Sequence, residues 1–242
     1  MSLFEGVLEL ADDHLVLGHR ISEWCGHAPM LEEDLALPNM ALDLIGTARS
    51  LYEYAGKLEG AGRDEDDLAY LRGEREYRNL LLCERPNEDF AHTVLRQLYF
   101  AAFMQPYWQA ALKSSDEVIV GIAGKAVKEM AYHIRHAGEW VIRLGDGTED
   151  SAQRMKNAVE ALHLYTGELF EPGAETHALP DRTALQPTWE ATIDRVFDDA
   201  MLSRPVVQYP QTGGRKGVHG EGLGHMLAVM QSVHRAHPGA TW

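Results

Sequence analysis

Apolar residues in the first 145 positions recur at intervals of three and four, the spacing of one face of an α-helix. The pattern predicts four long helices, at about 3–24, 31–58, 87–111 and 119–144. Gly26 and Pro29 interrupt the pattern after the first of them, and Gly60 and Gly62 after the second. Pro38 lies within the second segment, so we expect it either to kink that helix or to mark its true start.

Three shorter helical patterns follow, at about 151–170, from Thr188 to about 200, and from His219 to a point before Pro238. Four long helices followed by shorter ones are typical of an up-down-up-down four-helix bundle with additional C-terminal helices. Alternating apolar and polar residues, the mark of strands, are nearly absent. We therefore expect an all-α, ferritin-like fold in one domain, 1–242, with a core bundle at about 1–147 and accessory helices at about 148–242.

Composition narrows the classes of partner. The chain has a formal net charge of -15, and its only notable basic pair is Arg215–Lys216, so nucleic acid and anionic membranes are not expected partners. No apolar run approaches the ~20 residues that span a bilayer, and the first residues lack a signal-peptide pattern. Two cysteines, Cys25 and Cys83, do not form a disulfide framework. We expect a cytoplasmic protein.

Polar residues occupy positions on all four long apolar stripes, where aliphatic side chains would pack better. A buried polar group is costly unless it finds a partner, so we expect these side chains to meet in the bundle interior. Carboxylate-bridged di-iron proteins place their ligands in this way, with Glu and Glu-x-x-His motifs on facing helices. The candidates are His14, Asp34, Gln97, Glu129 and His133.

These candidates fall short of a di-iron ligand set. Only Asp34 and Glu129 are carboxylates, and two iron ions need several anionic oxygens. His133 follows Glu129 by four residues rather than three, and Leu37 stands where a histidine would follow Asp34. Two interpretations remain: the five residues bind metal, or they form a hydrogen-bonded polar core, for example through a contact between Glu129 and His133. The second is favoured, and it describes a vestigial site.

Two C-terminal features allow a functional or a structural interpretation. Residues 212–217, Thr-Gly-Gly-Arg-Lys-Gly, could hold a phosphate at backbone amides, but a surface loop that docks on a partner through Arg215 and Lys216 is favoured. His219 and Glu221 are two residues apart, so one helix would direct them to different sides. We interpret them as local capping and surface groups.

Several segments together resemble the C subunits of bacterial 1,2-phenylacetyl-CoA epoxidases, which are also called phenylacetyl-CoA oxygenases or monooxygenases. The resemblance extends over essentially the whole chain, and only the combination of segments is specific. The segments are Glu23–Pro29, Asp34–Leu37, Asn79–Leu82, Pro86–Asn87, Lys128–Glu129, Tyr132–His133, Leu144–Gly145, Gly147–Thr148, Thr212–Gly214, Lys216–Gly217, His219, Glu221 and Leu223–Gly224.

This resemblance implies a ferritin-like fold and a non-catalytic, structural role in phenylacetate catabolism. It implies that a homologous A subunit holds the di-iron centre and epoxidises the ring with dioxygen, and that a flavin and iron–sulfur reductase supplies electrons. This chain would hold no cofactor or catalytic residue of its own, and would pair with the A subunit and stabilise it. Self-association of the chain alone stays open. The alternative is a ferritin-like oxidase or oxygenase that binds metal and acts by itself.

Overall fold

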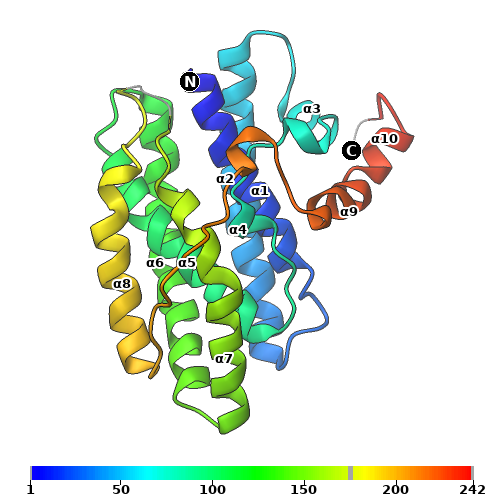
Figure 1. Ribbon diagram of the computed structural model, residues 1–242. Helices are drawn as coiled ribbons and strands as arrows, with labels where there is room; N and C mark the ends of the chain where they lie inside the picture. The colour runs from blue at the N-terminus through cyan, green and yellow to red at the C-terminus, as the bar shows by residue number, and fades with distance from the viewer. Residues whose placement is uncertain (1, 174–176, 241–242) are drawn as a thin grey trace.

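The computed structural model describes residues 2–173 and 177–240; residues 1, 174–176 and 241–242, which belong to the expected domain, lie outside it. Within the described residues, every regular element is helical, and the fold is the expected all-α, ferritin-like one. Figure 1 shows the long helices side by side as a bundle. The four long helices are α1 (Leu3–Ser22), α2 (Leu31–Glu59), α5 (Phe90–Ala111) and α6 (Glu117–Gly145).

Capping residues set several of these helix ends. Ser2 and Glu5 form a reciprocal capping box at the start of α1, and the Asp89 carboxylate accepts a hydrogen bond from a first-turn amide of α5. Asp116 does the same for two amides of α6. Gly60 ends α2 with a φ of 69°, a left-handed conformation that glycine adopts without steric cost.

Pro38 does not mark the start of the second helix. α2 begins at Leu31 and Pro38 lies inside it, which excludes the second of the two alternatives. Proline has no backbone N–H, so α2 lacks one main-chain donor at this point. The helix continues because apolar residues on both sides of Pro38, Leu37 and Met40, are buried in the core.

The bundle core forms where α1 packs on α2, α5 packs on α6, and α2 meets α6. Close approach of α1 and α2 depends on Gly18, because a Cβ there would lie 2.9 Å from Ile45 Cγ1. The core is built from aliphatic and aromatic side chains with almost no exposure, including Leu10, Leu44, Phe100, Trp108 and Ala126. Burial of this apolar surface is the main contribution to stability.

Shorter elements cover two sides of the bundle (Figure 1). α7 and α8 pack against α5 and α6. The helix predicted at 151–170 is an α-helix followed by 3-10 turns, and the last predicted helix divides into α9 and α10. These elements are α3 (Glu65–Tyr70), η1 (Glu74–Glu76), α4 (Leu81–Glu84), α7 (Glu149–Leu162), η2 (His163–Phe170), η3 (Thr183–Leu185), α8 (Gln186–Asp199), η4 (Gly214–Lys216), α9 (Glu221–Met230) and α10 (Ser232–Ala236).

An irregular segment, residues 201–220, connects α8 to α9 and is here called the C-terminal strap. Figure 1 shows it running from one end of α8 across the bundle to η4 and then to α9. It therefore brings Arg215 and the start of α9 against the first helix. Among the described residues, no helix combines the length and apolarity that a membrane span requires.

Candidate functional site

Four of the five polar candidates meet inside the bundle. His14 on α1, Gln97 on α5 and His133 on α6 are at most 1% exposed, and Glu129 on α6 is half-buried. Gln97 donates a hydrogen bond to His133, and His14 and Glu129 each interact electrostatically with His133, so polar residues on the facing stripes converge. The fifth candidate, Asp34, lies elsewhere.

His133 links two helices through its two ring nitrogens. Gln97 Nε2 donates to His133 Nδ1 at 2.9 Å, and His133 Nε2 donates to Asp43 Oδ2 at 3.2 Å. The ring is fully buried, whereas the Asp43 side chain is 35% exposed. A row of hydrogen bonds thus runs from the interior of α5 through α6 to the solvent edge of α2.

His14 is neutral in this environment. Its Nδ1–H donates to the carbonyl of Leu10 at 2.7 Å, and its Nε2 has no hydrogen-bond partner. The ring packs against Phe100 and Trp108, with centroids 5.3 and 5.8 Å away. Burial lowers the pKa of His14 to about 4, because the charged imidazolium would lose its hydration.

Glu129 pairs within its own helix, but not with His133 as the sequence interpretation suggested. Its Oε1 lies 3.0 Å from Lys125 Nζ, one turn earlier, and its Oε2 is buried without a partner. Burial raises the pKa of Glu129 above its usual value, although Lys125 and His133 oppose the shift. Glu129 Oε2 is therefore free to act as a ligand atom. Among the described residues, however, too few other metal-ligating side chains lie around it to hold a metal ion.

The prediction that Asp34 faces the core was wrong. Asp34 Oδ1 accepts a hydrogen bond at 2.7 Å from the backbone N–H of Gly26, in the connection between α1 and α2. The three-four stepping places Asp34 on the stripe, but at the first turn of α2 the carboxylate can reach a free loop amide. The adjacent Glu33 is the buried residue, and its Oε2 accepts from His136 Nε2 at 2.8 Å.

Sequence reasoning missed Glu33, Asp43 and His136. Both acids lie on the flank of α2 that meets α6, outside the main apolar stripe, so helical periodicity gives no sign of them. His136 does fall on the α6 stripe, in phase with His133, and that phase is the one signal available from sequence. Two histidine–carboxylate pairs therefore join α2 to α6.

The residues do not fit a di-iron centre. Within residues 2–173 and 177–240, no group of three or more His, Cys, Asp or Glu side chains is placed to hold a metal ion. Glu129 is the one carboxylate among the four converging candidates, and its first oxygen is already paired with Lys125. His14 uses Nδ1 to bond the Leu10 carbonyl, and its ring packs against Phe100 and Trp108. The arrangement is a hydrogen-bonded polar core.

A second buried polar cluster holds the C-terminal strap. Arg215 is 8% exposed and binds both oxygens of Asp13 on α1, at 2.9 and 2.7 Å. Glu168 Oε1 accepts from the amides of Gly213 and Gly214 at 2.8 and 2.7 Å. Arg215 is therefore a structural residue, and the expectation that it docks on a partner was wrong, whereas Lys216 is exposed.

His219 is also not a surface group. Its Nδ1 donates to Glu84 Oε2 at 2.7 Å and its Nε2 lies 3.0 Å from the carbonyl of Tyr77. Burial opposes the charged form, but the contacts with Glu84 and with the Tyr77 carbonyl, together with the charge of Asp12, outweigh it and raise the pKa of His219. The spacing between His219 and Glu221 gives no sign of Glu84. Only the tertiary structure reveals that His219 pairs with Glu84.

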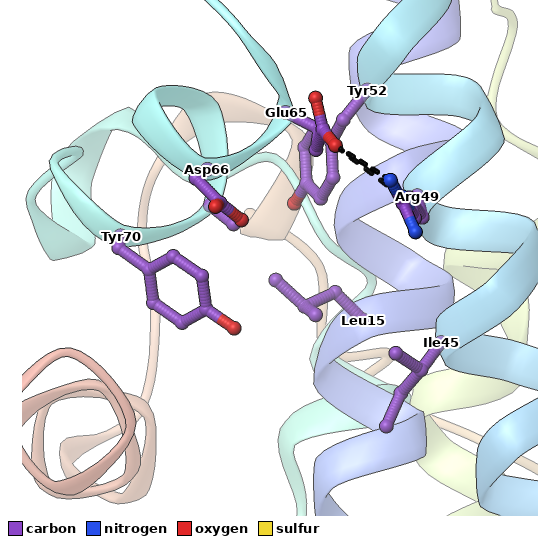
Figure 2. A pocket seen from close by; sticks show the side chains of 8 residues that line it. Leu15, Ile45, Arg49, Tyr52, Glu65, Asp66 and Tyr70 are labelled. Carbon is purple, nitrogen blue, oxygen red and sulfur yellow. Dashed lines mark hydrogen bonds and ion pairs between the residues drawn. The ribbon is translucent and has the colours of Figure 1, made fainter. Parts of the chain in front are cut away.

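A separate pocket of about 310 Å³ lies between α1, α2 and α3. Figure 2 shows Tyr52 and Tyr70 lining it, with Arg49 and Glu65 joined across one side. The Tyr52 hydroxyl donates to Asp12 at 2.5 Å, so it is not available to a ligand as a donor. This pocket is separate from the polar core, because none of the predicted site residues lines it.

Fold and site together define a ferritin-like helical bundle whose apolar core encloses a small hydrogen-bonded polar cluster. The chain belongs to the phenylacetic acid catabolic protein family, whose model matches residues 1–242. It is 44% identical over 241 residues to the C subunit of the 1,2-phenylacetyl-CoA epoxidase of Escherichia coli (strain K12), and the match covers 97% of each chain.

Proposed function

We propose that this chain is a non-catalytic, structural subunit of a phenylacetyl-CoA ring 1,2-epoxidase in aerobic phenylacetate catabolism. In this role it pairs in the cytoplasm with a homologous, di-iron catalytic A subunit and stabilises it. A flavin and iron–sulfur reductase completes the system by supplying electrons. The similarity to an epoxidase C subunit over nearly the full length of both chains supports the proposed complex.

One observation carries the non-catalytic part of the proposal. Among the four converging candidates Gln97 is neutral, and the one carboxylate, Glu129, is paired with Lys125. A di-iron centre built on these four residues would leave most of the positive charge of the metal uncompensated in a buried site. The polar core is better suited to fixing the arrangement of α5 and α6 than to chemistry.

The test is the iron content of the chain with and without its partner. The chain is purified by its own tag, once alone and once after co-expression with the other oxygenase subunits. We expect little iron per polypeptide in the first preparation, and an iron-bearing partner retained in the second. Near two irons per chain in the isolated protein would overturn the proposal and favour the alternative, a metal-binding oxidase active on its own.

A further inference from the structure

A pocket of about 170 Å³ lies between η2, α8 and the C-terminal strap, and is here called the η2–α8 pocket. Trp189 on α8 and Phe170 at the end of η2 form its aromatic walls, with ring centroids 5.5 Å apart and ring planes at 73°. The indole N–H of Trp189 is already engaged, since it donates to the backbone carbonyl of Tyr99 at 2.9 Å. The two rings therefore offer apolar surface in an edge-to-face arrangement that a further aromatic ring can join.

The strap is attached on both sides of the η2–α8 pocket. Arg204 binds both carboxylate oxygens of Asp194 on α8, at 2.6 and 3.0 Å, and the backbone N–H of Gln211 donates to a carbonyl of η2 at 2.9 Å. Between these two attachments, Val207 and Pro210 line the pocket. Because both ends of this stretch are fixed, the fold itself determines the shape of the pocket.

A buried histidine has a free ring nitrogen at this pocket. His163 is 6% exposed and lines the pocket. Its Nδ1 lies 3.1 Å from the hydroxyl of Tyr99, whereas its Nε2 takes no hydrogen bond from the part of the chain that the structure describes. Protein atoms do not enclose Nε2 completely, so the small exposed part of the side chain includes this nitrogen, which faces the pocket.

The Tyr99 hydroxyl fixes the proton of this histidine. Tyr99 is fully buried, and among the described residues its hydroxyl has His163 Nδ1 as its one partner. A buried O–H without an acceptor is costly, so the phenol donates to Nδ1 and the imidazole proton resides on Nε2. Burial, together with the charge of Arg204, lowers the pKa of His163 to about 4. His163 therefore presents a neutral N–H donor to the pocket at neutral pH.

The charged groups at the pocket offset one another. Arg204 lies 3.5 Å from Glu190, which also lines the pocket, and it is paired with Asp194. An anionic ligand would meet two carboxylates around one guanidinium, and a cationic ligand would have to compete with that guanidinium for both of them. A ligand without charge disturbs neither ion pair, so these surroundings favour a neutral molecule.

The volume of the pocket limits the size of the ligand. A protein cavity of about 150 Å³ accommodates benzene, so about 170 Å³ holds a single ring with a small substituent. The donor at His163 Nε2 requires that this substituent carry an acceptor, because a buried N–H left unpaired would cost free energy.

We infer that the η2–α8 pocket binds a small neutral aromatic molecule, which contacts the rings of Trp189 and Phe170 and accepts a hydrogen bond from His163 Nε2 through an oxygen atom. This inference goes beyond the proposed function and does not depend on it. The pocket shares no lining residue with the polar core, and binding requires neither iron nor a partner subunit.

The test titrates the full chain with benzamide and with benzoate, which have nearly the same shape but differ in charge. NMR follows the indole N–H signal of Trp189, which is identified by its loss in Trp189→Phe. We expect benzamide to shift this signal with a dissociation constant on the order of 1 mM, the range for a ligand of about nine non-hydrogen atoms. Benzoate is expected to bind at least about 10-fold more weakly, because it meets the carboxylates of Glu190 and Asp194.

Gly167 allows the pocket to be obstructed from the solvent side. It is exposed and lines the pocket, and a Cβ there would lie 3.9 Å from Pro210 Cβ, an ordinary contact. Gly167→Leu is therefore expected to fold normally and to weaken benzamide binding at least about 10-fold. The matched control is Gly121→Leu, since Gly121 is exposed on α6 and its Cβ would meet nothing within 4 Å. This control is expected to bind benzamide within about twofold of the unsubstituted chain.

His163→Phe tests the hydrogen bond separately, because it keeps a ring and removes the donor. It is expected to weaken benzamide binding, and Gly167→Leu provides the test of the site should the loss of the Tyr99 contact unfold this variant.

Four results would overturn the inference. They are the absence of a benzamide-dependent shift at Trp189, unchanged affinity in Gly167→Leu, and equal affinity for benzoate, which would exclude a preference for neutral ligands. The fourth is loss of benzamide binding when the iron-bearing subunit is added, which would assign the pocket to a side chain of that partner. None of these results alters the iron content of the chain, so the proposed function is tested separately.

Discussion

Arg215 binds both carboxylate oxygens of Asp13, although 202 residues separate them in the sequence. The pair fixes the C-terminal strap to the first helix, and Arg215 Nη1 also donates to the carbonyl of Arg78 at 2.7 Å. The ion pair with Asp13 raises the pKa of Arg215, which therefore stays charged despite its burial. A buried charge of this kind becomes strongly destabilising when its ion-pair partner is removed.

Arg215→Ala is expected to lower the free energy of unfolding by about 3–5 kcal/mol, because it leaves Asp13 buried without its counter-charge. The neighbouring Lys216 is exposed, so Lys216→Ala is expected to change stability by less than about 0.5 kcal/mol. Urea denaturation of both variants measures the difference. Equal stability of the two variants would show that the strap is not held by this contact.

The decrease in the free energy of unfolding at acidic pH is expected to depend on His14. Its pKa in the folded state is about 4, below the ordinary 6.5, so only the unfolded chain takes up a proton between these pH values. The free energy of unfolding therefore falls as pH drops from about 6.5 to about 4, by roughly 3 kcal/mol from this residue. His14→Leu is expected to flatten this limb.

A control for that measurement is His27→Ala, since His27 is exposed in the connection after α1. Denaturation midpoints are recorded at several pH values between 4 and 7 for the three proteins. An unchanged acid limb in His14→Leu, with a changed one in His27→Ala, would contradict the assignment of the proton uptake to His14.

Gln97 and His133 are expected to be energetically coupled. Gln97→Leu or His133→Leu alone leaves the remaining polar group buried without its partner, at a cost of about 1–3 kcal/mol. The double substitution removes both groups, so its cost is expected to be smaller than the sum of the single costs. A double-mutant cycle by chemical denaturation measures this coupling, and strict additivity would show that the hydrogen bond contributes nothing.

Two glycines are expected to respond oppositely to alanine. A Cβ at Gly214 would overlap the backbone carbonyl oxygen of Asn79, so Gly214→Ala is expected to destabilise the protein and loosen the strap. Gly124 lies within α6 with nothing close to its Cβ position, and Gly124→Ala is expected to stabilise by about 0.5–1 kcal/mol. Thermal unfolding distinguishes the two, and stabilisation by both would rule out close packing at Gly214.

The sequence by itself determined the helices. Spacings of three and four between apolar residues follow directly from 3.6 residues per turn, so the four long helices and their approximate ends could be predicted. The same pattern indicated that His14, Gln97, Glu129 and His133 share an interior, because residues on core-facing stripes must meet when the stripes pack together. The shortage of carboxylates was also visible from the residues at those stripe positions.

Tertiary structure decided which partner each polar group takes. Asp34 lies on the predicted stripe but binds a loop amide, and Asp43 lies off the stripe yet pairs with His133. Arg215 looked like a surface cation and is buried against Asp13. Periodicity reports which side of one helix faces inward, whereas hydrogen-bond partners depend on how separate helices and loops are positioned in space. That positioning is set by packing of the whole chain, and no local spacing encodes it.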